Sequence, residues 1–448
     1  MSQGLYSGVS GLAIGTGLYK GVPGLWSGAS GLITPNTNPS LSLNFLTGTL
    51  DPRITFTRTN PVATFVGSNG FIQTAASNVP RFDYDPVTLQ PKGLLIEEQR
   101  TNSLLYSEQF DNASWLKVGT TATANDVSVV APDGTTNADK LAETAVTAEH
   151  YIEQGSISVV AGSSYTFSIY VKAAGRSQVV LRYTLAASWV GGISPQVLYD
   201  FSTVTTTIIS GGSAITARSL TAVGGGWYRC SITATCAANS SPSARLHLYN
   251  GGISYAGNTA LGVYLYGSQF ETGAFGTSYI PTTTPAVIRS ADIATMTGTN
   301  FSSWFNASAG TFVANFEASP NQYATYIAAS NGVVGQNSVH FDNDATGVMR
   351  AVYYSGSAAV ATLSLGSYGT AGTVNTVGSA YAVDDFAASR NGGAVVTDTS
   401  GALPVGQNQL NIGADPSAAA VNVTNTHIRY LNYYNTRLPD GTLQSLTA

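Results

Sequence analysis

Charged side chains are scarce in this chain. Only 10% of its 448 residues are Asp, Glu, Lys or Arg, and 19 basic against 24 acidic residues give a net charge of -5 at pH 7. No segment gathers Lys and Arg, whereas proteins that bind nucleic acid carry a basic patch that neutralises phosphates. We therefore expect no nucleic-acid partner.

Cysteine is nearly absent as well. Both cysteines, Cys230 and Cys236, lie in the stretch WYRCSITATC, where small or apolar residues alternate with polar ones as in a half-buried strand. Six residues of strand put the thiols about 20 Å apart, beyond disulfide reach. We expect two small core residues, and a chain without disulfides fits assembly inside a cell better than an oxidising secretory route.

Long hydrophobic runs are also missing, which bears on the first 32 residues. They carry one charge, Lys20, and no unbroken apolar segment, so neither a signal peptide nor a membrane helix is expected. Three similar phrases recur there, GLYSGVSGL, GLYKGVPGL and GLWSGASGL. Their glycines do not fall at every third position, as collagen requires, and each would cost a helix about 1 kcal/mol.

The remaining interpretation of these repeats is an extended segment that binds another protein. Its leucine and aromatic side chains cannot bury one another along an extended backbone, and a seven-residue unit spans at most about 23 Å. Residues 1–35 are therefore predicted to be an anchor, and the alternative is a disordered low-complexity tail. The side chains expected to make the contacts are Leu5, Tyr6, Leu18, Tyr19, Leu25 and Trp26.

The chain is rich in residues typical of strands and turns. It has 48 Gly and 24 Tyr, with short alternating runs such as SYTFSIYVKA, QVVLRYTL and GVYLYGSQFE between turn residues. This pattern predicts an all-β fold with two tandem β-sandwiches of the jelly-roll type. The expected divisions are the anchor, a small β shoulder or connector at 36–100, a first sandwich at 101–283 and a second at 284–448.

Several longer phrases are similar to a known group of proteins. FDYDPVTLQPKGLLIEEQRTNSLLYSEQFDNASW (82–115) resembles a phrase of tailed-bacteriophage fibre and head-spike proteins, where it introduces a jelly roll similar to carbohydrate-binding modules. WYRCSITATC and VYLYGSQFETGAFGTSYIPTT resemble the closing strands of that module. IGADPSAAAVNVTNTHIRYLNYYNTRLPDGTLQSLT resembles the end of a concanavalin/laminin-G-like sandwich. The resemblance implies a homotrimer on the virion surface, made in the host cytoplasm.

Sugar recognition by sandwiches commonly uses aromatic rings beside turns, with polar side chains nearby for the hydroxyls. Trp189, in AASWVGGISP, is the preferred candidate because it lies next to two glycines in an expected loop. For each ring taken singly, packing in the core or at its rim is the more common role, because most aromatic side chains of sandwiches are buried. The other candidates are Trp115, Tyr183, Tyr249 and Tyr255.

Signals for catalysis are weak. Glu97 and Glu98 are adjacent on an expected strand and face opposite sides, so they cannot form a paired acid and base. The four histidines lack zinc-ligand spacing, and neither a nucleophile elbow nor a β-helical repeat is visible. We expect no enzyme and no cofactor, and a capsule depolymerase remains the less favoured alternative.

One stretch resembles the first half of a calcium loop. In DNDATG, Asp342 and Asp344 could turn oxygens toward one ion, but Tyr353 stands where the closing glutamate would be. The stretch also suits a hairpin turn, which is the preferred interpretation.

Together these features predict a phage fibre or spike on head or tail. Its N-terminal repeats would bind capsid or tail proteins, and its sandwiches would bind host-surface polysaccharide without membrane insertion. A purely structural decoration or connector protein is the alternative.

Overall fold

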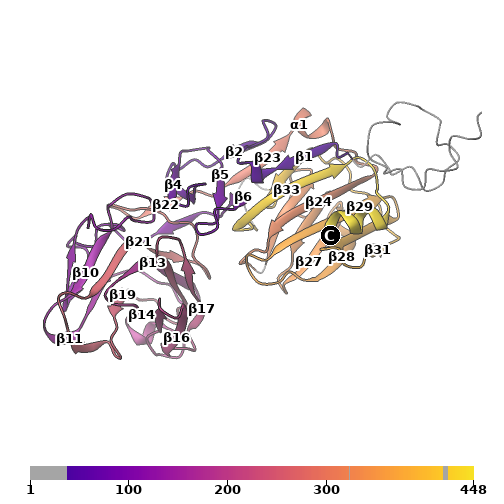
Figure 1. The fold of residues 1–448 in the computed structure, drawn as a ribbon. Coiled ribbons are helices and arrows are strands. Elements are labelled where there is room, and N and C mark those ends of the chain that lie inside the picture. The colour runs from indigo at the N-terminus through magenta and orange to yellow at the C-terminus, as the bar shows by residue number, and fades with distance from the viewer. Residues whose placement is uncertain (1–37, 322, 417–421) are drawn as a thin grey trace, which may run out of the picture. The chain divides into compact units, whose positions relative to one another are not determined.

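The computed structural model describes residues 38–321, 323–416 and 422–448. The chain divides into two compact units, Met1–Asn38 and Pro39–Ala448, and the fold below is that of the second. It is all-β, built from antiparallel sheets that form sandwiches, as predicted (Figure 1). The six predicted anchor residues, Leu5, Tyr6, Leu18, Tyr19, Leu25 and Trp26, lie outside the described residues.

The first sandwich consists of two six-stranded sheets. One has the order β17 (Ile215–Ala222), β18 (Trp227–Thr235), β13 (Ser164–Ala174), β21 (Gly262–Thr272), β10 (Asp139–Glu143) and β9 (Thr120–Thr123). The other has the order β16 (Thr205–Ser210), β15 (Gln196–Asp200), β14 (Gln178–Tyr183), β19 (Ala244–Leu248), β12 (Tyr151–Gln154) and β8 (Leu116–Val118). The predicted alternation is confirmed, because Cys230, Ile232 and Cys236 are buried in the core and both cysteines are free.

The second sandwich packs an eight-stranded sheet against a seven-stranded one. The first runs β31 (Val396–Asp398), β30 (Asp385–Arg390), β29 (Val374–Ala382), β24 (Gly310–Glu317), β33 (Thr426–Tyr434), β6 (Pro91–Ile96) and β5 (Arg81–Tyr84), and β1 (Leu41–Asn44) also pairs with β33. The second runs β2 (Thr55–Thr57), β23 (Ile293–Thr297), β32 (Gln409–Ile412), β25 (Ala324–Ser330), β26 (Ser338–Asn343), β27 (Val348–Ser355) and β28 (Ala358–Ser367).

The expected shoulder at 36–100 needs correction, because it is not a separate sheet. Its strands β1, β2, β5 and β6 belong to the two sheets of the second sandwich, and Figure 1 shows indigo β1 beside yellow β33. Leu43, Phe56 and Ile96 lie in the same core as Phe312. Strands of three to six residues bury too little apolar surface to fold alone, so they complete a sheet contributed by the other end of the chain.

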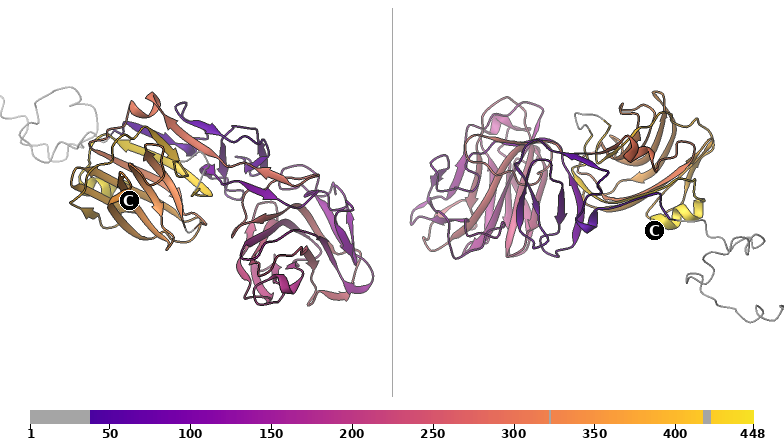
Figure 2. Two further views of the ribbon diagram at one scale, coloured as in Figure 1. Left: turned by 180° about the vertical axis from the view of Figure 1, so that it is seen from behind. Right: turned by 90° about the horizontal axis from the view of Figure 1, so that it is seen from above.

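Short ribbons, two α-helices and two 3-10 helices, η1 (Phe45–Thr47) and η2 (Ala186–Ser188), complete the described part of the unit. The ribbons are β3 (Ala63–Val66) with β4 (Ile72–Ala75), β7 (Arg100–Asn102) with β22 (Val287–Arg289), and β11 (Thr147–Glu149) with β20 (Ser254–Ala256). Of the helices α1 (Thr299–Ser302) and α2 (Asp440–Thr447), α2 covers the outer side of β29, where a Cβ on Gly378 would lie 2.7 Å from Leu443 Cδ1 (Figure 2). Among the described residues no helix is long and apolar enough to cross a membrane.

Candidate functional site

An open groove of about 460 Å³ lies in the second unit. Its floor is formed by β17 and β18, and its walls come from the β3–β4 ribbon and from residues 275–279. Ligand sites commonly occupy about 300–1,000 Å³. The groove is therefore large enough to hold one or two sugar rings.

Hydroxyl groups cover the floor of the groove because strand residues alternate between faces. Cys230 and Ile232 point into the core, so Ser231 and Thr233 point out, and Ser219 lies opposite Ser231 on β17. The Ser219 and Ser231 hydroxyl oxygens are 2.7 Å apart. A saccharide could exchange hydrogen bonds with these groups, since each hydroxyl both donates and accepts.

Two arginines line the groove without a carboxylate partner among the described residues. Arg229 donates to the Thr277 carbonyl at 2.7 Å and to Ser168 Oγ at 2.9 Å, and it lies over the Tyr170 ring. Arg218 is exposed and donates from Nε to Thr206 Oγ1 at 2.9 Å. Arg229 is thus fixed in place in the groove, whereas Arg218 lies opposite Ile232 in the strand register and its side chain reaches β16 of the other sheet, away from the floor.

Apolar side chains form the walls. The half-buried wall residues are Phe65, Val66, Ile72, Val223 and Phe275. A polar floor with an apolar and aromatic wall is typical of a pocket that orients a ligand through hydrogen bonds and packs against its less polar side.

His427 closes one end of the groove between two carboxylates. Its Nε2 is 2.9 Å from Asp83 Oδ2 and its Nδ1 is 2.7 Å from Glu317 Oε2, while Lys92 Nζ is 3.3 Å from the same Glu317 oxygen. Burial and Lys92 act to lower the pKa of His427, but Glu317 and Asp83 outweigh them and raise it. The imidazolium therefore bridges β33, β24 and β5.

The carboxylates that line the groove are occupied by internal partners. Glu97 accepts hydrogen bonds from Arg81 and from the Ser278 hydroxyl, and it forms an ion pair with Arg289. Burial acts to raise the pKa of Glu97, but these partners hold that pKa well below its usual range. Asp83 binds His427 and the Val66 amide. A glycosidase needs a carboxylic acid with a raised pKa as proton donor, and Glu97 does not fit that role.

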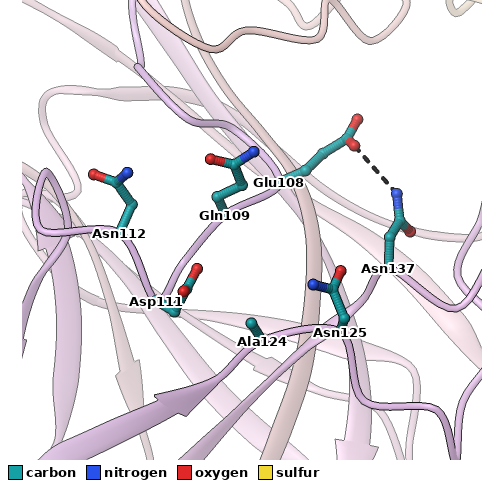
Figure 3. Close-up of a pocket in the computed structure, with 7 residues that line it drawn as sticks. All are labelled: Glu108, Gln109, Asp111, Asn112, Ala124, Asn125 and Asn137. Atoms are coloured by element: carbon teal, nitrogen blue, oxygen red, sulfur yellow. Dashed lines mark hydrogen bonds between the residues drawn. The ribbon is translucent and has the colours of Figure 1, made fainter.

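A second hollow, of about 280 Å³, lies among loops of the first sandwich (Figure 3). Glu108 accepts from Asn137 Nδ2 at 3.3 Å, and burial, the largest influence, raises the pKa of Glu108. The nearby carbonyls of residues 110–112 accept from Lys117 Nζ. The hollow is lined by Glu108, Gln109, Asp111, Asn112, Ala124, Asn125 and Asn137, so it offers neither cation nor ring to a ligand.

The prediction that Trp189 binds a sugar is wrong. Trp189 is fully buried, stacks on the equally buried Tyr183 with 4.4 Å between ring centroids, and donates from Nε1 to the Thr184 carbonyl at 2.8 Å. Tyr183 donates to the Ile232 carbonyl at 2.8 Å. Both rings belong to the core because the 186–192 loop folds back over the end of the sandwich, so neither can stack on a sugar.

Two of the other three predicted aromatics, Trp115 and Tyr255, also have internal partners. Trp115 is buried and donates to the Tyr106 carbonyl at 3.0 Å, which again corrects the prediction of an exposed ring. Tyr255 is half-buried, with its hydroxyl 2.6 Å from Glu143 and Arg176 over its ring. Tyr249 is half-buried at the end of β19. The structure brings none of the five to the groove.

The predicted hairpin turn at 342–347 is confirmed. Asp344 Oδ1 accepts from Thr346 N at 2.8 Å and Val348 N at 3.1 Å, which closes the turn between β26 and β27. Asp342 accepts two hydrogen bonds from Arg350, at 3.0 and 2.9 Å. The two candidate calcium ligands thus share a guanidinium, and among the described residues no group of three or more His, Cys, Asp or Glu could hold a metal.

The groove residues were missed although one signal for them was visible. The alternation in WYRCSITATC identified the buried parity, and the other parity contains Arg229, Ser231 and Thr233. The outward parity alone did not show that the β3–β4 ribbon and residues 275–279 would enclose it.

No protein-family model matches the sequence, and no curated protein matches it. Among solved structures, the Ruminococcus gnavus IT-sialidase CBM40 bound to α2,3 sialyllactose is similar over 33% of this chain and 87% of that chain, with 16% identity and a TM-score of 0.30. Domains LG4-5 of the mouse laminin α1 chain are similar over 62% of this chain and 84% of that chain, with 8% identity and a TM-score of 0.24. These are distant similarities of β-sandwich fold.

Proposed function

We propose that the first sandwich binds a cell-surface saccharide in the groove over β17 and β18. The observation that carries the proposal is the combination of the Ser219 and Ser231 hydroxyls, the Arg229 guanidinium and the apolar wall in one open groove. The distantly similar Ruminococcus gnavus IT-sialidase CBM40 has been seen bound to α2,3 sialyllactose.

The proposed setting is the surface of a tailed-phage virion, as a fibre or spike that recognises its host. This part depends on the resemblance of residues 82–115 and the other quoted phrases to such proteins. Residues 1–35 would anchor a homotrimer to capsid or tail proteins, and the groove would bind host polysaccharide without cleaving it, because Glu97 and Asp83 are held by internal partners.

Filling the groove tests saccharide binding. Ser219→Trp places a large ring on the groove floor, whereas Ala222→Trp changes an exposed residue of the same strand whose side chain lies on the other face. In a glycan-array or host-cell binding assay, Ser219→Trp should weaken binding at least tenfold while Ala222→Trp binds like the parent. Equal binding by both variants would refute the groove as the site, and no binding by the parent at high valency would favour the structural alternative.

Deleting residues 1–32 tests the anchor. The shortened chain should keep its oligomeric mass in native mass spectrometry but fail to join particles. Normal incorporation would contradict an anchoring role. Release of reducing sugar from host capsule by the purified parent would instead support the depolymerase alternative.

A further inference from the structure

The second sheet of the first sandwich has an outward face with unusual polar side chains. Along β12, β19 and β14, Ile152, Leu246 and Leu181 lie in the core, so their strand neighbours point away from it. The outward positions are Tyr151 and Glu153 on β12, Arg245 and His247 on β19, and Val180 and Arg182 on β14. This sheet does not contribute to the groove described above.

Arg182 is a cation without a partner on this face. It forms no hydrogen bond or ion pair with any described residue, and its Nε is buried without an acceptor. It lies directly opposite Arg245 in the strand register, an arrangement of like charges that is unfavourable in itself. An anion bound at Arg182 would relieve that repulsion.

Arg245, in contrast, is neutralised locally. Its Nε donates to Glu153 Oε2 at 2.8 Å, its Nη1 is 3.5 Å from Glu149 Oε2, and its guanidinium lies 3.7 Å from the centre of the Tyr151 ring. Both glutamates pair with Arg245, and neither forms an ion pair with Arg182. The unfilled donors therefore belong to Arg182.

His247 is a diagonal neighbour of Arg182 across the β14–β19 pair. It is fully buried, and neither ring nitrogen has a hydrogen-bond partner among the described residues. Burial, helped by Arg245 and Arg182, lowers its pKa to about 3, so the ring is neutral at pH 7 with one donor and one acceptor unfilled. Buried polar groups without partners are rare in native proteins and call for a ligand or water.

We infer that Arg182, beside the buried His247, forms a second binding site, which takes the carboxylate of an acidic saccharide. The planar guanidinium matches a carboxylate in two parallel hydrogen bonds, and the buried His247 ring next to it would report the bound charge. Gln196 lies opposite Arg182 on β15 and offers an amide for an adjacent hydroxyl. The inference stands independently of the groove, which lies on the other sheet.

The test is a titration of the full chain with glucuronate, followed by NMR of ¹³C-labelled histidine side chains. Glucuronate should shift the His247 signals saturably, and equal concentrations of glucose or acetate should have far weaker effects. Arg182→Gln should weaken glucuronate binding at least tenfold, and Arg182→Lys should give a smaller loss because it keeps the charge but not the planar fork. Arg53→Gln, in a partly exposed ion pair of the second sandwich, is the matched control and should bind like the parent.

Three results would overturn the inference. They are equal shifts with glucose, equal shifts with acetate, or unchanged affinity in Arg182→Gln. If Arg182→Gln lowers the melting temperature sharply, the Lys variant decides, because unchanged affinity there rejects the bidentate site. A negative result here would not contradict saccharide binding in the groove, because Ser219→Trp tests that proposal separately.

Discussion

Arg58 and Asp292 form an ion pair between residues 234 positions apart in sequence, with 3.0 Å between Nη1 and Oδ1 and neither side chain exposed. Arg81 links Asp292 to Glu97, and Arg289 Nη1 lies 2.8 Å from Glu97 Oε2. This buried network joins segments next to β2, β5, β6, β22 and β23. It holds the N-terminal strands to the segment that follows the first sandwich.

Arg81→Ala should destabilise the protein by about 3–5 kcal/mol, because it leaves Asp292 and Glu97 buried with less compensation. Urea unfolding measures the change. The matched control is Arg53→Ala, whose partner Asp51 is 20% exposed, and its loss should stay within about 1 kcal/mol. Similar losses of unfolding free energy in both variants would show that the buried network contributes no more to stability than a surface ion pair.

His427 should make stability fall as the pH rises. Its pKa in the folded protein is raised above the ordinary 6.5, so the stabilisation is complete below pH 6.5 and is lost as the pH passes through the raised value. Unfolding free energies between pH 6 and 9 should show this decline in the parent and a flatter profile in His427→Gln. Parallel profiles would contradict the role of the bridging imidazolium.

Trp189→Ala should cost about 3–5 kcal/mol of stability, as expected for a large buried ring. Trp189→Phe should cost less, because a ring still packs on Tyr183. Neither variant should change saccharide affinity when binding is measured well below its melting temperature. A stable Trp189→Ala that loses binding would restore the ring as a ligand contact.

Both cysteines should resist thiol reagents in the native protein. Burial raises the pKa of the Cys230 thiol, and Cys236 is equally inaccessible. In denaturant without reductant, two thiols per chain should react. Fewer than two would reveal a disulfide.

Local pattern was sufficient to predict many strands and the buried side of each. In β13 and β18 the alternation of residues such as Phe167 and Cys230 with polar neighbours identified the core face, because successive strand side chains point to opposite sides. The hairpin at Asp344 was predictable for a similar reason, since an Asx turn uses only neighbouring residues.

Only the tertiary structure shows which residues far apart in sequence are in contact. Sequence does not show that β1 pairs with β33, that Arg58 meets Asp292, or that Trp189 packs on Tyr183, because each contact depends on how the sheets assemble. The same holds for the unpartnered Arg182 and for the groove over Ser231, whose surroundings come from several separate segments. The sequence by itself determined an all-β chain and the parity of its strands, whereas long-range packing determined which polar side chains remain free to bind.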